Sequence, residues 1–246
     1  MTPSEYTTLA RVEASHWWYA GMRRIAEQML REIDLPPCAR VLDAGCGAGG
    51  ALAWLGAFGS PYGIDIHPLA ARYAAAACPR VAAASVHALP FADGTFDAVT
   101  SFDVLYHLAV RDDEAALAEM VRVLRPPARG AAGGWLVIRV PAHDWLRRAH
   151  DRHVQTRHRY GRRELHDKLS AAGLEVVRLT PVGATLLPGA MARWLTQRSG
   201  DPRSDVVLPP APVNHLLEML LTAEAAWLRK RDLPMGLSLI ALGRRR

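Results

Sequence analysis

The chain lacks the roughly 18-residue apolar run that a membrane-spanning helix requires, and its first residues contain acids but no apolar signal-peptide core. Cysteine is also scarce, with three residues at Cys38, Cys46 and Cys78. Their spacing fits no metal motif, and an odd number disfavours a disulfide framework. We therefore expect a cytoplasmic protein with no membrane span, no metal and no structural disulfides.

Lysine is nearly absent, since Lys168 and Lys230 are the only lysines among 30 basic residues. The net charge of +6 is local, because residues 139–163 alone hold eight arginines and two aspartates. Two interpretations stay open: a solvated arginine-rich surface, or an anion-recognising surface, because arginine binds phosphate and carboxylate in a bidentate fork. Aromatic residues that would stack on single-stranded nucleic acid are few there, so nucleic acid is not the expected partner.

Hydrophobic residues make up 50% and charged residues 22% of the 246, which indicates one globular domain spanning 1–246. Apolar strand-like runs alternate with helical patterns along most of the chain. Strands are expected near 40–44, 62–66, 80–85, 97–102, 134–140, 174–180 and 236–242, and helices near 4–33, 48–57, 68–77, 111–124, 162–172 and 213–231. This alternation predicts a Rossmann-like, doubly wound α/β sheet of about seven mostly parallel strands, with ligands at their carboxyl edge.

Four segments divide this domain: an N-terminal helical cap (1–35), a cofactor-binding core (36–180), a helical insertion (181–233), and a last strand with a basic tail (234–246). The insertion is rich in proline and contains one long apolar helical run. That helix either packs on the sheet as core, forms a lid over a hydrophobic acceptor, or forms a dimer interface.

A glycine cluster follows the first predicted strand, in the segment VLDAGCGAGG. Gly45, Gly47 and Gly50 match the dinucleotide fingerprint, and Asp65 lies where an acid would hold ribose hydroxyls. NAD and S-adenosylmethionine both fit this spacing. Asp43, directly before the glycines, would repel a pyrophosphate but attract the ammonium and sulfonium groups of S-adenosylmethionine. The segment therefore favours S-adenosylmethionine.

Three further segments, YGIDIHP, ALPFADGTFDAV and SFDVLYHL, follow in order. Together with VLDAGCGAGG, they resemble the class I S-adenosylmethionine-dependent methyltransferases over residues 40–140. The segment HWWYAGMRR, which starts at His16, resembles a bacterial subgroup of that family. The resemblance implies a methyltransferase whose last strand is antiparallel, with S-adenosyl-L-methionine as cofactor and S-adenosyl-L-homocysteine as product.

Location and resemblance together suggest a cofactor site. Asp43 would hold the methionine ammonium, Asp65 the ribose, and Ile66 would flank the adenine. Ser85 stands where relatives often have an aspartate, so the adenine contact shifts to the backbone of Val86. The other cofactor-binding residues expected are Trp18, Tyr19, Arg23, Ala44, Gly45, Cys46, Gly47, His87, Phe102, Asp103 and His107.

Methyl transfer from a sulfonium is an in-line displacement, and it needs a general base only when the acceptor loses a proton early. The candidate bases are His16, His107, His150, His153 and His158, with Tyr160 facing the acceptor. Our hypothesis is that one histidine of the group at 150–158 deprotonates an acceptor hydroxyl.

The leading interpretation is a methyltransferase that acts at oxygen on a small-molecule or lipid-linked metabolite, which is anionic or hydrophobic. One alternative is a methyltransferase fold that binds the cofactor but acts as a cyclase or scaffold. An RNA methyltransferase ranks last, because no appended RNA-binding module is visible. Whether the chain forms a homodimer stays open.

Overall fold

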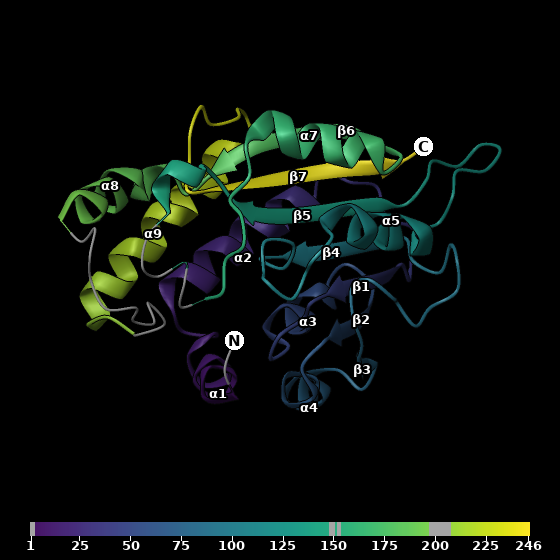
Figure 1. Cartoon of the computed structure of the whole chain (residues 1–246), viewed down its shortest axis with the longest axis horizontal. Coiled ribbons are helices and arrows are strands. Elements are labelled where there is room, and N and C mark those ends of the chain that lie inside the picture. Colours follow the sequence, from purple (N-terminus) through teal and green to yellow (C-terminus); the bar gives the residue numbers. More distant parts are fainter. Residues whose placement is uncertain (1–2, 148–150, 152–153, 197–207) are drawn as a thin grey trace.

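A seven-stranded sheet organises the computed structural model, which describes residues 3–147, 151, 154–196 and 208–246. The strands are β1 (Arg40–Ala44), β2 (Ser60–Asp65), β3 (Val81–Ala83), β4 (Ala98–Phe102), β5 (Trp135–Pro141), β6 (Leu174–Val182) and β7 (Ser238–Arg245). Their order is β3-β2-β1-β4-β5-β7-β6, and β7 runs antiparallel to both of its neighbours (Figure 1). The predicted fold class, with its antiparallel last strand, is confirmed.

Helices flank this sheet and follow the predicted alternation. They are α1 (Pro3–Val12), α2 (Trp17–Leu30), α3 (Gly50–Leu55), α4 (Pro68–Ala77), α5 (Asp113–Val123), α7 (Arg162–Ala171), α8 (Leu187–Thr196) and α9 (Ala211–Leu228), with short 3-10 turns η1 (Asp144–Leu146) and η2 (Ala184–Leu186). Local signals explain their starts. The Asp112 side chain accepts hydrogen bonds from the backbone N–H groups of Glu114 and Ala115 and so caps α5.

Side chains alternate between the two faces of the sheet and create two cores. Leu42 and Ala44 of β1 belong to the core that α5 and α7 cover, whereas Val41 belongs to the core that α2 and α9 cover. Val41, Leu42 and Ala44 are all fully buried, as expected for a central strand that is covered on both faces.

The insertion contributes to the second core. Leu221 and Leu228 of α9 are buried in the same cluster as the apolar face of α2. The outer side of α9 leaves Leu216 and Trp227 more than half exposed. Helix α9 therefore has a packing role, and its roles as a lid or a dimer interface stay predictions. Among the described residues, no helix is both long and apolar enough to cross a bilayer.

The carboxyl ends of β1 to β5 share one edge of the sheet, because these strands pair with one another in parallel. Figure 1 shows α1, α8 and α9 gathered beyond that end of the sheet. The N-terminal cap and the insertion thus lie near the edge where ligands bind in such sheets.

Candidate functional site

The glycine loop between β1 and α3 is a sharp turn of bare backbone. Gly45 has φ of +94° and Gly47 of +54°, in the left-handed region that favours glycine. A Cβ at Gly45 would collide with the side chain of Val104. The N–H groups of Gly45 and Cys46 both donate to the carbonyl of Ile64 at 2.8 Å, which fixes the loop against β2. Glycine is therefore required at position 45, where Val104 packs against the turn.

Asp43 lies at the end of β1, directly below this loop, with 2% of its surface exposed. The Thr100 hydroxyl of β4 donates a 2.8 Å hydrogen bond to Asp43 Oδ1. Burial raises the pKa of Asp43 to about 7; Thr100 and Arg139 lower it, and the charge of Asp65 raises it. Few groups offset the cost of burying this negative charge, so the Asp43 carboxylate favours a cationic partner.

Asp65, at the end of β2, is held by backbone groups on both oxygens. The N–H of Gly47 donates to Oδ2 at 3.0 Å, and the N–H of His67 donates to Oδ1 at 2.8 Å. Burial raises the pKa of Asp65, and these two hydrogen bonds oppose the shift. Each carboxylate oxygen has a further lone pair, so Asp65 can still accept from two ligand hydroxyls.

A cavity of about 500 Å³ lies next to Asp65. It is lined by Ile66, His87, Leu108, Ala109, Arg111 and Asp112. Ile66 is 57% and Leu108 55% exposed, so two aliphatic side chains face solvent at a site that could take a flat ring. Ile66 and His87 are predicted cofactor residues, whereas the sequence analysis did not single out Leu108 or Arg111.

The segment 85–87 below this cavity is held by its own hydrogen bonds. The Ser85 hydroxyl accepts from the N–H of His87 at 3.2 Å and lies 3.3 Å from the ring nitrogen Nδ1 of His87. His87 Nε2 lies 3.0 Å from the carbonyl of Asp112. Val86 packs in the core with 7% of its surface exposed. Ser85 thus orients His87, and a role for the Val86 backbone at the adenine stays a prediction.

Comparison with known proteins identifies this arrangement. Residues 42–132 match a family model described as a methyltransferase domain. The chain carries a class I S-adenosylmethionine-dependent methyltransferase domain. Its cofactor is S-adenosylmethionine, and the matched segment includes both Asp43 and Asp65.

Two curated Streptomyces proteins match part of the chain. Methyltransferase GfsG of Streptomyces halstedii is 33% identical over 118 residues, 43% of this chain and 41% of that protein. A 37.1 kDa protein in transposon TN4556 of Streptomyces fradiae is 35% identical over 144 residues, 51% of this chain and 39% of that protein. The chain thus spans about two fifths of the length of these curated relatives.

Solved structures share the fold of the methyltransferase domain at low identity. A methyltransferase of Thermotoga maritima gives a TM-score of 0.61 at 17% identity, covering 98% of this chain and 100% of that one. The [4+2]-cyclase SpnF gives a TM-score of 0.57 at 19% identity, covering 91% of this chain and 80% of that one. Geranyl diphosphate C-methyltransferase of Streptomyces coelicolor was solved with S-adenosyl-L-homocysteine. It gives a TM-score of 0.58 at 16% identity, covering 90% of this chain and 75% of that one.

The residues of the methyltransferase domain fit its cofactor chemically. Asp43 is a buried acid that would suit the ammonium at the methionine end, and Asp65 has acceptor oxygens that would suit the ribose hydroxyls, so both assignments stay predictions. The cavity at Ile66 offers an apolar surface for the adenine. Cys46, for which burial is the main cause of a raised thiol pKa, packs with Leu52 and Ala74 and contributes backbone and size rather than thiol chemistry.

The aromatic residues at the start of α2 lie partly buried. Trp18 packs against the core shared by α2 and α9. Tyr19 lies close enough to Tyr106 for their charges to interact: burial raises the pKa of Tyr106, and Asp103 and Tyr19 add to the shift. Arg23 is turned toward Glu27, 2.7 Å from its Oε1, with 54% of its side chain exposed. The predicted contacts of these three residues with the cofactor stay predictions.

The end of β4 is tied to β5 by a partly buried ion pair between Asp103 and Arg139. Asp103 has φ of +61°, uncommon for a residue other than glycine, and Arg139 Nη2 donates to its Oδ2 at 2.5 Å. The Arg139 guanidinium lies 5.3 Å from the ring centre of Phe102. Ala44 at the end of β1 is buried, and its carbonyl accepts a hydrogen bond from the Ser101 hydroxyl. The predicted contacts of Ala44, Phe102 and Asp103 with the cofactor stay predictions.

The candidate bases are scattered. His107 Nδ1 accepts from the N–H of Ala109 at 3.1 Å, beside the cavity-lining segment 108–112. The His16 ring accepts from the N–H of Trp18 at 3.2 Å and caps α2. His158 Nε2 lies 2.7 Å from Glu164 Oε1 of α7. His150 and His153 lie outside the described residues. The described residues contain no group of three or more His, Cys, Asp or Glu suited to a metal ion.

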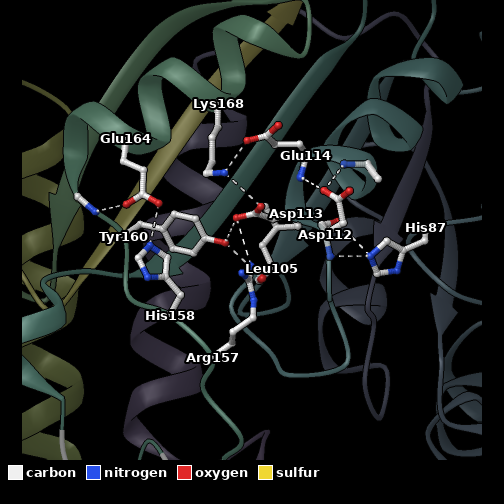
Figure 2. A network of polar contacts seen from close by, with 12 residues as sticks. His87, Leu105, Asp112, Asp113, Glu114, Arg157, His158, Tyr160, Glu164 and Lys168 are labelled. Atoms are coloured by element: carbon white, nitrogen blue, oxygen red, sulfur yellow. Dashed lines mark hydrogen bonds and ion pairs between the residues drawn. The ribbon is translucent and has the colours of Figure 1, made fainter.

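Tyr160 lies in the core rather than facing an open cavity, with 0% of its surface exposed. Figure 2 shows its hydroxyl pointing at Asp113, to which it donates at 2.7 Å. Lys168 and Arg157 converge on the same carboxylate at 3.2 and 3.3 Å. Burial raises the pKa of Tyr160, and Asp113 raises it further. The geometry gives Tyr160 a structural role, and a catalytic one stays a prediction.

Two residues that the sequence analysis passed over lie at the carboxyl edge. Glu13, from the turn between α1 and α2, accepts a hydrogen bond from the backbone of Gly50 in the glycine loop. His143 follows β5 with φ of +62°, and its Nε2 is buried with no hydrogen-bond partner among the described residues. No local motif marks either residue, because each acquires its position through contacts distant in sequence.

Proposed function

We propose that the chain is a methyltransferase that transfers the methyl group of S-adenosylmethionine to an oxygen atom of a small-molecule or lipid-linked metabolite. The choice of S-adenosylmethionine as methyl donor is supported by the pair of acids at the ends of β1 and β2, within a methyltransferase domain. The bound cofactor supplies an activated methyl group, so the chain must bind it, exclude water and place the acceptor in line.

His143 supports an oxygen acceptor. Burial and the nearby charge of Arg159 lower the pKa of His143, so its imidazole is neutral at pH 7 and able to accept a proton. A residue with positive φ at the end of a parallel strand is typical of a functional position. In the proposed step the acceptor oxygen bonds to the methyl carbon, the carbon–sulfur bond breaks, and the hydroxyl proton passes to His143 Nε2.

Apolar surface beside His143 supports an acceptor with a hydrophobic part. The Trp145 ring centre lies 5.6 Å from that of His143, and Trp145 is 48% exposed. One of the comparison proteins, geranyl diphosphate C-methyltransferase, bears a name that fits a small-molecule acceptor, although the name gives carbon rather than oxygen as the methylated atom. An anionic group on the acceptor stays a prediction from the arginine-rich segment 139–163, in which Arg139, Arg157 and Arg159 are paired with acids of the fold.

The test is formation of S-adenosyl-L-homocysteine with a panel of hydroxylated aromatic, aliphatic and prenyl compounds. With an accepted compound, His143→Ala should lower turnover about 10²- to 10⁴-fold and leave the affinity for S-adenosyl-L-homocysteine within twofold. The matched control is His166→Ala, since His166 pairs with Asp167 on the exposed face of α7. Unchanged turnover in His143→Ala would remove the proposed base. His150→Ala, His153→Ala and His158→Ala test the earlier candidates in the same assay.

The cyclase or scaffold alternative rests on the fold shared with SpnF. It predicts tight binding of S-adenosyl-L-homocysteine without methyl transfer to any compound of the panel. Conversion of a compound to an unmethylated product of the same mass would favour the cyclase.

A further inference from the structure

The turn between α1 and α2 places a second carboxylate on the glycine loop. A Cβ on Gly50 would overlap the carboxylate of Glu13, so this side chain lies directly on the loop backbone. Burial raises the pKa of Glu13 to about 7, the charge of Asp43 raises it further, and the hydrogen bond from Gly50 lowers it. Glu13 from the cap and Asp43 from the sheet therefore bring two carboxylates to the same loop, near enough for the charge of Asp43 to act on Glu13.

Two like charges brought together in a partly buried place are unfavourable unless a cation joins them. The methionine end of S-adenosylmethionine carries an ammonium and a sulfonium beside its own carboxylate, and Asp43 is the residue that we expect to face the ammonium. The acidic pair is thus matched to the cofactor that the methyltransferase domain uses.

Helix α9 fixes the turn that carries Glu13. Asn214 Oδ1 accepts from the N–H of Trp17 at 3.0 Å, and Asn214 Nδ2 donates to the carbonyl of Ser15 at 2.9 Å. On the other side, the Thr7 hydroxyl of α1 lies 3.1 Å from the Tyr73 hydroxyl of α4. The turn is thus fastened to the late insertion and to the cofactor-binding core.

The geometry points to Glu13 as a second anionic anchor for the methionine end of S-adenosylmethionine, on a turn that closes over the cofactor and is latched by Asn214 of α9. This inference rests on the cofactor of the domain and is independent of which acceptor is methylated.

The test compares two ligands by isothermal titration: S-adenosyl-L-homocysteine, which has the amino-acid end, and 5′-methylthioadenosine, which lacks it. Glu13→Gln should weaken S-adenosyl-L-homocysteine about 10- to 100-fold, as expected for loss of a charge-assisted contact, and leave 5′-methylthioadenosine within threefold. Asn214→Ala should give a smaller loss with the same ligand selectivity. The control Glu175→Gln, from an exposed ion pair with Arg244, should change neither affinity.

Three outcomes overturn the inference. Equal losses of affinity for both ligands would indicate a structural role for Glu13. Tighter binding of S-adenosyl-L-homocysteine by Glu13→Gln would indicate that Glu13 blocks the site. Unchanged affinity would exclude a contact between Glu13 and the ligand. If the Glu13→Gln variant does not fold, the inference can still be tested on the unaltered chain. Affinity for S-adenosyl-L-homocysteine should rise from pH 6 to pH 8, as Glu13 and Asp43 ionise, and a flat profile would contradict the anchor.

Discussion

Thr100 and Asp43 join neighbouring strands through a buried 2.8 Å hydrogen bond from hydroxyl to carboxylate. This bond favours the ionised form of Asp43, because a hydroxyl donor stabilises negative charge. The cofactor site thus depends on a residue of β4 that has no exposed surface of its own.

Thr100→Val preserves the shape of the side chain and removes the donor. The pKa of Asp43 should then rise further, so the affinity for S-adenosyl-L-homocysteine should fall about 5- to 50-fold at pH 7 and partly recover at pH 8.5. Isothermal titration at both pH values measures this. Ser101→Ala is the control, since the Ser101 hydroxyl donates to the carbonyl of Ala44 and not to Asp43. A Thr100→Val profile identical to that of the unaltered chain would show that the bond does not tune Asp43.

Asp65→Asn tests the acid at the end of β2. An amide offers one acceptor oxygen, so one of the N–H groups of Gly47 and His67 would face an NH₂ donor. We expect about a 100-fold loss of affinity for S-adenosyl-L-homocysteine and for 5′-methylthioadenosine alike, since both carry the ribose. Asp167→Asn, on the exposed surface of α7, serves as the comparison. Retained affinity in Asp65→Asn would place the ribose elsewhere.

Tyr160→Phe separates a structural from a catalytic tyrosine. Loss of the hydroxyl leaves Asp113 with Lys168 and Arg157, and should lower the free energy of unfolding by about 1–3 kcal/mol. Turnover and cofactor affinity should stay within threefold. Chemical denaturation of Tyr160→Phe, Asp113→Asn and the double variant gives the coupling between the two side chains. A hundredfold loss of turnover at unchanged stability would instead support the catalytic role predicted from the sequence.

The pH dependence of stability follows from the raised pKa of Asp43. A carboxyl whose folded-state pKa is about 7 binds its proton more tightly in the folded than in the unfolded chain. Its contribution to the free energy of unfolding is therefore lost as the pH rises from about 4 to about 7, on the order of a few kcal/mol. Without cofactor, Asp43→Asn should be more stable than the unaltered chain at pH 8, and this advantage should shrink toward pH 5. An advantage that grows toward pH 5 would contradict the assigned shift.

The acids at the ends of β1 and β2 can be predicted from the sequence, because the patterns that mark them are local. Asp43 and Asp65 each follow a short apolar run, and the glycines between them occupy backbone conformations that other residues disfavour. The β-α alternation likewise predicts the order of elements, and the resemblance predicts the antiparallel last strand.

The residues that escape sequence analysis depend on distant partners. Asn214 contacts Ser15 and Trp17 across separations of 199 and 197 residues, and these contacts position Glu13. Tyr160 shows the converse. Its neighbours His158 and Arg159 suggest an acceptor surface, but the extended segment directs its ring into the core toward Asp113. Periodicity and motifs carry no information about such pairings.

Isothermal titration of the unaltered chain with S-adenosyl-L-homocysteine and with NAD tests the central claim most directly. The acids at the ends of β1 and β2 predict one bound S-adenosyl-L-homocysteine per chain, lost in Asp43→Ala, and no binding of NAD. Binding of NAD, or no binding of S-adenosyl-L-homocysteine by the folded chain, would contradict the account.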